Sequence, residues 1–260
     1  MNKLLEYKYF LFQLVKKHIV NQYKQTILGP SLQILNPFLQ SGLFAIIFGK
    51  ILDINTDGVP NLLYYLVSVT LFNFFRTATL KSSIIFTSFA TLFKSFYFPK
   101  ILMSISIIIE SIILYFFQFI IMILILMIFY EGEITIKLTN ILISVIPLLQ
   151  YSIVALSVGM ILSSLTFKYR DLMGFTGYIM QGLFFLTPVI YSSSLIIKNY
   201  EWFFHLNPLF YSIKLFKYLF FGTDYPDIKF LYSNYAVTLL LLIVAIKLFN
   251  YADKRFDDFT

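Results

Sequence analysis

Residues 101–129 read ILMSISIIIESIILYFFQFIIMILILMIF, an apolar run with a single charged side chain, Glu110. A helix crosses the hydrocarbon core of a bilayer with about 20 mainly apolar residues, so this run is long enough to span a membrane. Because it is longer than a bilayer requires, its first turns can lie at the membrane interface, which would place Glu110 less deep than its position in the run suggests. The run therefore predicts a transmembrane helix and indicates a membrane protein.

Apolar runs of this kind recur along the whole chain. Hydrophobic residues make up 59% of the 260 residues and charged residues 13%, a composition that does not describe a soluble globule. The runs are continuous rather than alternating, and lipid cannot satisfy the backbone of an open strand, so helices are the expected structure. We predict an all-α integral membrane protein with six transmembrane helices, which cover roughly residues 32–52, 61–80, 101–129, 140–163, 173–191 and 233–249.

Lysine and arginine are distributed unevenly between the loops. Residues 53–60 contain neither and residues 130–139 contain only Lys137, whereas residues 1–29 and 81–100 are rich in lysine. Because cytoplasmic loops carry the excess of positive charge, both termini are predicted to be cytoplasmic. We expect one membrane domain over residues 1–260, with an interface helix at 1–29, a six-span core at 32–249 and a cytoplasmic tail at 250–260.

The first helix is expected to be amphipathic. Such a helix lies along the inner leaflet, with Lys17 and Lys24 drawn to anionic headgroups. Gly29 is expected to end this helix and Pro30 to open the next one, which turns the chain into the membrane. A plain membrane anchor without a further role is an equally good interpretation of the pattern. Phe10 departs from the apolar arc, which holds Leu4, Leu5, Leu11, Phe12, Val15, Ile19 and Tyr23.

Two charged side chains fall inside predicted spans, Arg76 in the second and Glu110 in the third. Intramembrane charges are usually paired or functional, so a structural pair, with Arg76 as the candidate partner of Glu110, is preferred to a proton or substrate role. His18 and His205 lack a second ligand at metal-binding spacing, and the chain has no cysteine. We therefore predict no metal site and no catalytic residue.

Two short motifs resemble binding loops without completing them. Residues 53–58, DINTDG, match the start of an EF-hand calcium loop, but the twelfth position is Tyr64 rather than the bidentate glutamate. An external turn is the better interpretation. Gly49-Lys50 lacks the other positions of a phosphate-binding loop. The chain offers no means of hydrolysing a nucleotide, and we expect it to carry no cofactor of its own.

Several segments, read in order, resemble one family of transport proteins. They are QYKQTILGPSLQILNPFLQSGLFAIIFGKI at 22–51, LFKSFYFPKILM at 92–103, FKYRDL at 167–172, and LTPVIY with LNPLFYSIKLFKYLFFG between 186 and 222. Their order and spacing are similar to those of the membrane subunit of type-2 ATP-binding-cassette exporters of polysaccharides and teichoic acids. Two positions depart from that pattern: Gln22, where many members have arginine, and Ser104, where a proline is common.

The resemblance implies a homodimer in the bacterial cytoplasmic (inner) membrane, joined to two copies of a separate ATPase, which would bind ATP and magnesium. It also implies a short coupling helix before Phe98-Pro99, and re-entrant half-helices within residues 192–232, whose apolar stretches are too short to span. A membrane-surface loop is the competing interpretation of the coupling segment. The residues expected to receive the ATPase stroke are Lys94, Phe96, Phe98, Pro99, Lys100, Arg170 and Asp171.

Aromatic residues make up 20% of the chain, with 31 Phe and 19 Tyr. Rings beside a transport path could stack on the faces of sugars, although membrane packing and interfacial belts account for most of them. The candidates for lining such a path come from the first, second and fifth spans. They are Phe44, Phe48, Tyr64, Tyr65, Phe72 and Phe184.

These features together predict the permease subunit of an exporter of a lipid-linked surface glycan similar to O-antigen, with ATP hydrolysis on the partner and no role for nucleic acid. An exporter of drugs or small lipids from the same superfamily is the alternative within transport. A membrane-embedded glycan polymerase would be expected to offer convergent acids or histidines, and Glu110 is the only deep carboxylate. An autonomous ion channel would need no ATPase.

Overall fold

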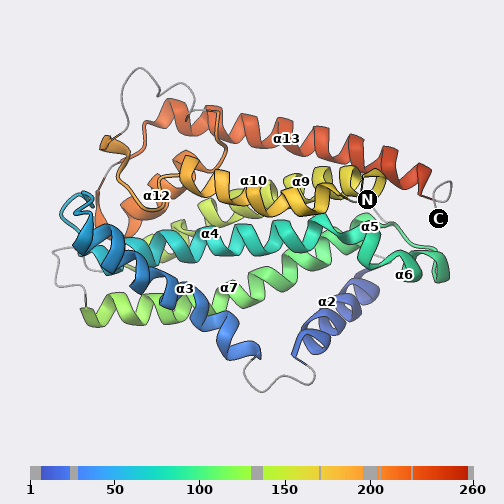
Figure 1. Ribbon diagram of the computed structural model, residues 1–260, viewed down its shortest axis with the longest axis horizontal. Coiled ribbons are helices and arrows are strands. Elements are labelled where there is room, and N and C mark those ends of the chain that lie inside the picture. The colour runs from blue at the N-terminus through green and yellow to red at the C-terminus, as the bar shows by residue number, and fades with distance from the viewer. Residues whose placement is uncertain are drawn as a thin grey trace.

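The computed structural model describes residues 7–23, 29–129, 137–169, 171–195, 204, 206–223 and 225–256. This part of the chain folds into helices joined by turns and contains no strand, so the all-α prediction is confirmed (Figure 1). The helices are α2 (Lys8–Tyr23), α3 (Gly29–Phe44), the π-helix η1 (Ala45–Ile51), α4 (Asn61–Ser83), α5 (Ile85–Ser88), α6 (Ala90–Ser95), α7 (Ile101–Phe129), α8 (Leu138–Ile143), α9 (Val145–Lys168), α10 (Leu172–Leu186), the 3₁₀-helix η2 (Ser193–Leu195), α12 (Phe210–Phe221) and α13 (Ile228–Arg255).

Within the described ranges, four segments are long and apolar enough to cross a membrane: Ser31–Ile51, Ile101–Phe129, Leu138–Lys168 and Ile228–Arg255. They correspond to the first, third, fourth and sixth predicted spans. The fifth predicted span is α10, which is apolar but has 15 residues. The second is α4, which has 23 residues but is more polar than the others. The helices therefore describe a multi-pass membrane protein.

The polarity of α4 follows from its place at the centre of the molecule. α7 and α9 run beside it, and α9 in turn packs against α13 (Figure 1). Every side chain from Leu63 to Phe75 is buried. The hydroxyl of Ser68 donates to the carbonyl oxygen of Tyr64 at 2.9 Å, within the same helix. A helix enclosed by protein needs no apolar surface for lipid, because its side chains face other helices instead of acyl chains, and hydroxyls such as that of Ser68 bond to the backbone of their own helix.

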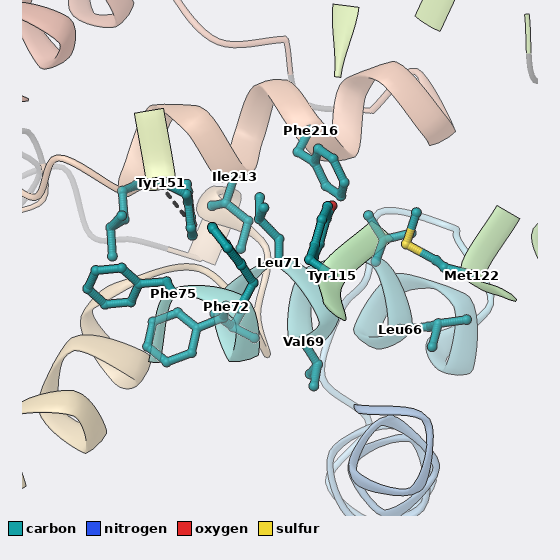
Figure 2. Packing of buried hydrophobic residues seen from close by; sticks show 14 of the residues in the cluster. Leu66, Val69, Leu71, Phe72, Phe75, Tyr115, Met122, Tyr151, Ile213 and Phe216 are labelled. Atoms are coloured by element: carbon teal, nitrogen blue, oxygen red, sulfur yellow. Dashed lines mark hydrogen bonds between the residues drawn. The ribbon is translucent and has the colours of Figure 1, made fainter. Parts of the chain in front are cut away.

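The larger hydrophobic core forms around α4. Figure 2 shows Phe72 and Phe75 of α4 in one cluster with Tyr151 of α9, Tyr115 of α7 and Phe216 of α12. The rings of Phe75 and Tyr151 meet edge to face, with centroids 6.0 Å apart, a geometry that aromatic pairs prefer. This core holds the short helix α12 among the long helices.

A second core lies at the other end of the bundle, where α2, α6 and the end of α13 meet. It consists largely of phenylalanine rings. The Phe86 centroid lies 4.9 Å from that of Phe249 and 5.7 Å from that of Phe256, and Phe93 lies 5.7 Å from Phe256. Leu14 of α2 is buried in the same cluster. Because these side chains are closely packed, a displacement of one helix here is transmitted to the others.

The break between α2 and α3 differs in detail from the prediction. α2 ends at Tyr23, Lys24 lies outside the described residues, and α3 begins at Gly29. Pro30 occupies the first turn of α3, as predicted, since a missing N–H costs no helical hydrogen bond at that position. Gly29 opens α3 instead of ending α2, so that part of the prediction is wrong.

The buried face of α2 agrees only in part with the predicted apolar arc, of which Val15 is buried. Leu14 is buried, and Phe10, which departed from the arc, packs its ring against Phe98 with centroids 4.7 Å apart. Phe12, predicted on the arc, is 62% exposed, and Lys17 is exposed as well. The helix therefore uses Phe10 and Leu14 to contact the protein and leaves Phe12 on the surface.

Candidate functional site

The predicted coupling segment is exposed beside the second core. α6 ends at Ser95, and residues 96–100 lead from it into α7. The predicted short helix before Phe98-Pro99 is thus present as α6. Phe96 is 62% exposed, Tyr97 is fully exposed, and Lys94 lies on the surface. Exposed aromatic rings beside a basic residue suit a contact with another protein, because aromatic anchors supply most of the energy of such contacts.

Phe98 does not belong to this exposed surface. Its side chain is buried, and its ring centroid lies 4.7 Å from that of Phe10 in α2 and 5.7 Å from that of Phe93 in α6. Pro99, which follows it, is exposed and fixes the backbone just before α7 begins. The prediction that Phe98 contacts a partner is corrected: Phe98 anchors the segment to the second core.

Lys100 is held from within the protein. Its Nζ lies 2.5 Å from Oδ1 of Asp253 in α13 and 4.5 Å from the centroid of the Phe256 ring. A partly exposed ion pair contributes only about 1 kcal/mol at most, so this contact matters mainly for geometry. Lys100 therefore joins the coupling segment to the end of α13, instead of projecting toward a partner.

The second predicted coupling position follows α9. Arg170 lies outside the described residues, while Asp171 is exposed directly before α10. Its carbonyl oxygen accepts the N–H of Gly174 at 3.1 Å. A carboxylate at this place also stabilises the helix, because the N-terminus of a helix carries a partial positive charge. Asp171 thus has a structural role whatever it contacts.

One connected cluster contains all the rings predicted to line a path: Phe44, Phe48, Tyr64, Tyr65, Phe72 and Phe184. The Phe44 ring lies at its centre, with centroids 5.5 Å from Phe48, 6.5 Å from Tyr65 and 5.6 Å from Phe184. Phe184 also contacts Phe72 at 5.1 Å, and Tyr65 contacts Tyr64 at 5.8 Å. Rings from α3, η1, α4 and α10 thus form one aromatic wall, the name used below for these six residues.

Part of the aromatic wall is closed to a passing substrate. Tyr64, Tyr65 and Phe72 are buried in the protein. Phe44, Phe48 and Phe184 are half-buried. The first three therefore do not line a path in this structure, and the prediction is corrected for them: they support the wall from behind. A substrate could touch only the three half-buried rings.

A buried lysine supports the same wall from α12. Lys217 is 4% exposed; its Nζ donates to the Tyr64 hydroxyl at 2.6 Å and to the carbonyl oxygen of Pro188. The ammonium also lies 3.8 Å from the centroid of the Tyr64 ring, within cation–π distance. The Tyr64 hydroxyl in turn donates to the Tyr191 carbonyl oxygen at 2.9 Å. Lys217 therefore ties α12 to α4 and to the turn that follows α10.

A buried amide network holds α12 to α9 and α13. Nε2 of Gln150 donates to Oδ1 of Asn234 at 2.7 Å and to the carbonyl oxygen of Pro208 at 2.9 Å. The hydroxyl of Ser212 donates to Oε1 of Gln150. Asn234 then donates to the carbonyl oxygen of Asn207 at 2.7 Å. Such a network is stable in a buried setting because its polar groups find partners.

The intramembrane carboxylate has a different partner from the one predicted. Oε1 of Glu110 lies 2.7 Å from Nζ of Lys81 in α4, and Oε2 lies 3.8 Å from Nδ1 of His18 in α2. Arg76 is not part of this group, so the suggested Arg76 pair is wrong, while the expectation that Glu110 is paired is correct. The carboxylate connects α4, α7 and α2.

His18 is a weaker partner for Glu110 than Lys81. Burial lowers the pKa of His18 below its ordinary value, and the neighbouring Glu110 opposes this only in part. At neutral pH the imidazole is therefore mainly uncharged. Its ring also lies 5.3 Å from that of Phe89, edge to face. The charge pair is thus between Glu110 and Lys81, and His18 places α2 beside it.

A family comparison fits the resemblance seen in the sequence. The ABC-2 type transporter model matches residues 9–221, which extend from the start of α2 to the end of α12. The chain belongs to this family. An ABC-2 membrane domain is a transport protein and not itself a catalyst. Membership also implies an ATPase partner, and the apolar helices agree with a multi-pass position in a membrane.

Two curated relatives cover almost the whole of this ABC-2 transporter. Both are called O-antigen export system permease protein RfbA and come from Klebsiella pneumoniae. The first is 27% identical over 259 residues and the second 25% identical over 257 residues. In each case the alignment covers 95% of this chain and 95% of the relative.

Three polar residues that hold the helices of this ABC-2 transporter together are not among the residues predicted from the sequence. Lys217 lies four positions after Ile213 and seven after Phe210, on the buried face of α12, and this spacing was a usable signal. The position of Lys81 in the sequence predicts only a loop charge, although it lies in the last turn of α4. Gln150 offered no signal, because one amide in an apolar run has no distinctive spacing.

Proposed function

We propose that the protein is the membrane-spanning subunit of an ATP-driven exporter that moves a lipid-linked, O-antigen-like surface polysaccharide across the bacterial cytoplasmic membrane. The observation that carries this proposal is the similarity to two O-antigen export permeases over 95% of the chain. The aligned region covers 95% of this chain and therefore extends over both the coupling segment and the aromatic wall. It supports a shared architecture for the whole subunit and not for one helix pair.

The proposed assembly contains two copies of this chain and two copies of a separate ATPase. Each copy contributes six spans, with α4 and α10 as the second and fifth, and both termini lie in the cytoplasm. α12 has 12 residues, about 18 Å of helix, which is too short to cross a bilayer. We place it as a re-entrant half-helix near the outer mouth, where Lys217 and the Gln150 network satisfy its polar groups.

ATP hydrolysis on the partner would enter this subunit at the coupling segment. Phe96 and Tyr97 are the exposed rings that an ATPase cleft could hold, with Lys94 beside them. From there Phe98 leads into the second core and Lys100 leads to Asp253 at the end of α13. A push on the segment would therefore move α2 and α13 together, because α2 packs on Phe98, α13 packs on Phe93, and these two rings contact each other.

The aromatic wall supplies the surface for the glycan. Phe44, Phe48 and Phe184 present ring faces or edges from three elements, and sugars stack on such surfaces without fixed hydrogen bonds. A long polymer can then slide past, since no single contact has to be broken at high cost.

Deleting this chain in the bacterium that carries it should abolish surface polysaccharide and cause lipid-linked glycan to accumulate on the inner side of the membrane. Export stops because the membrane path is missing while synthesis continues. The measurement compares surface and intracellular glycan by gel electrophoresis, and a plasmid copy of the chain should restore export. Normal surface polysaccharide in the deletion strain would refute the proposed function.

Replacing both Phe96 and Tyr97 with alanine should lower copurification of the coexpressed ATPase at least tenfold, because two exposed anchors of about 1 to 2 kcal/mol each are removed. The variant should remain folded, since neither ring is buried. The matched control is the Tyr225→Ala/Tyr232→Ala pair, two exposed rings just before and just after the start of α13. That end of α13 lies away from α6 (Figure 1). Equal copurification in the two variants would show that the segment is not the coupling surface.

A further inference from the structure

A polar cavity of about 320 Å³ lies between α3, α4 and α7, apart from the coupling surface and the aromatic wall. Figure 1 shows α3 lying across the other two helices. The cavity is within the size range of small-molecule sites. Its polar lining comes from five amide side chains, three hydroxyl side chains and one cation: Gln33, Asn36, Gln40, Asn73, Gln118, Thr77, Ser111, Tyr115 and Arg76. No carboxylate occurs among the described residues that line it.

Two hydrogen bonds hold part of this lining in place. Nδ2 of Asn73 donates to Oε1 of Gln40 at 2.8 Å, and Nε2 of Gln118 donates to the carbonyl oxygen of Gln33 at 2.9 Å. The side chains of Asn73, Gln40 and Gln118 each offer a further donor or acceptor, because a side-chain amide has both. Groups that donate and accept side by side match the hydroxyl groups of a sugar or polyol.

Arg76 gives the cavity its charge. The carboxylate of Glu110 is occupied by Lys81, and none of the ion pairs among the described residues includes Arg76. Its side chain is exposed at the mouth of the cavity, and a cation at membrane depth is costly without an anionic partner. The planar guanidinium fits two oxygens of a phosphate in parallel, and amides cannot replace that charge.

The surroundings of the cavity indicate how a ligand would reach it. α3 also exposes Leu32, Leu35 and Leu39, and α7 exposes Phe117 and Ile120. A molecule with its polar end in the cavity could lay an acyl or prenyl chain along these apolar surfaces, which both belong to apolar helices of spanning length. A free, fully polar ligand would gain nothing from them.

We propose that this cavity binds the headgroup of a membrane lipid in which a phosphate is joined to a hydroxyl-rich group, with Arg76 on the phosphate and the amides on the hydroxyls. Two lipids share that chemistry: the carrier-linked glycan and a phospholipid such as phosphatidylglycerol. The carrier-linked glycan is chosen as a probe because of the proposed function. The assignment of the cavity as a lipid site does not depend on that function. Binding requires neither ATP nor export, so its failure would leave the proposed function standing.

The test measures lipid binding to the purified full-length protein in phosphatidylcholine nanodiscs. Three probes are titrated: a polyprenyl diphosphate disaccharide, phosphatidylglycerol, and the neutral polyprenol. Arg76→Gln should lower the affinity for the disaccharide probe at least tenfold, and Arg76→Lys should recover part of that affinity. The matched control is Lys50→Gln, which removes an exposed cation outside the cavity and should change affinity less than twofold. Asn36→Leu, at another exposed lining residue, provides a second variant.

If Arg76→Gln and Asn36→Leu each weaken the binding of both phosphate lipids equally, the site binds phosphate headgroups of both kinds. If Asn36→Leu changes the binding of neither, the amides do not contact the ligand and the inference is overturned. If Asn36→Leu weakens the disaccharide probe alone, the site takes the glycan carrier. The inference is overturned if neither cavity variant alters binding, if Lys50→Gln has the same effect as Arg76→Gln, or if polyprenol binds as tightly as the phosphate lipids.

Discussion

Replacing Glu110 with leucine should destabilise the protein by about 3 kcal/mol, because removal of one partner leaves the other charge in a partly buried site. Glu110 is 2% exposed. The side chain of Lys81 is 28% exposed, so the expected loss of stability is at the lower end of the range for buried pairs. Equilibrium unfolding by a denaturing detergent in mixed micelles measures the change.

A second substitution separates loss of the ion pair from loss of packing. The Glu110→Leu/Lys81→Met variant removes both charges, and its stability should return to within about 1 kcal/mol of the wild type, since a buried pair replaced by apolar groups is often neutral. Glu110 also contacts α2 through His18 at 3.8 Å, and that loss would remain in both variants. If the double variant is as unstable as Glu110→Leu alone, the charge of Lys81 is not the cause of the destabilisation.

Replacing Gly159 with alanine should destabilise the protein by about 2 to 3 kcal/mol through overpacking. Gly159 of α9 lies against α4, and a Cβ built on it would lie only 2.3 Å from Cβ of Ser82. Since the contact involves the first atom of the Ser82 side chain, no rotamer change can relieve it, and the two helices must move apart. Small residues allow such close approach in membrane bundles. The same detergent titration measures the loss.

The control for this prediction is Gly42→Ala in α3, where a new Cβ would meet nothing within 4 Å. That change should be neutral or mildly stabilising, because alanine favours a helix by about 1 kcal/mol over glycine. Adding Ser82→Gly to Gly159→Ala removes the opposing Cβ and should recover part of the loss, whereas Ser82→Ala should not. Equal effects of Gly159→Ala and Gly42→Ala would show that the α4–α9 contact is not tight.

The helical class and the approximate positions of the runs were predictable from the sequence, because length and continuous hydropathy are local properties. The family was predictable from ordered motifs, and the turn at residues 53–58 is present, with the Asn55 side chain accepting the N–H of Asp57 at 2.9 Å. Pro30 likewise opens α3, since a proline restricts its own backbone wherever it occurs. None of these features depends on a distant residue.

Which side chains meet was decided only by the tertiary structure. Arg76 and Lys81 both lie near the end of α4, but five positions turn a helix by about 140°, so they face different neighbours. The sequence does not define how α4 is rotated about its axis relative to α7. It therefore does not distinguish Arg76 from Lys81 as the partner of Glu110. The sequence likewise does not show that Phe98 contacts Phe10, which lies 88 positions earlier in the chain. Nor does it show which rings of the aromatic wall are buried. Periodicity defines the faces of each helix; the packing of helices against one another decides which face becomes core, cavity or surface.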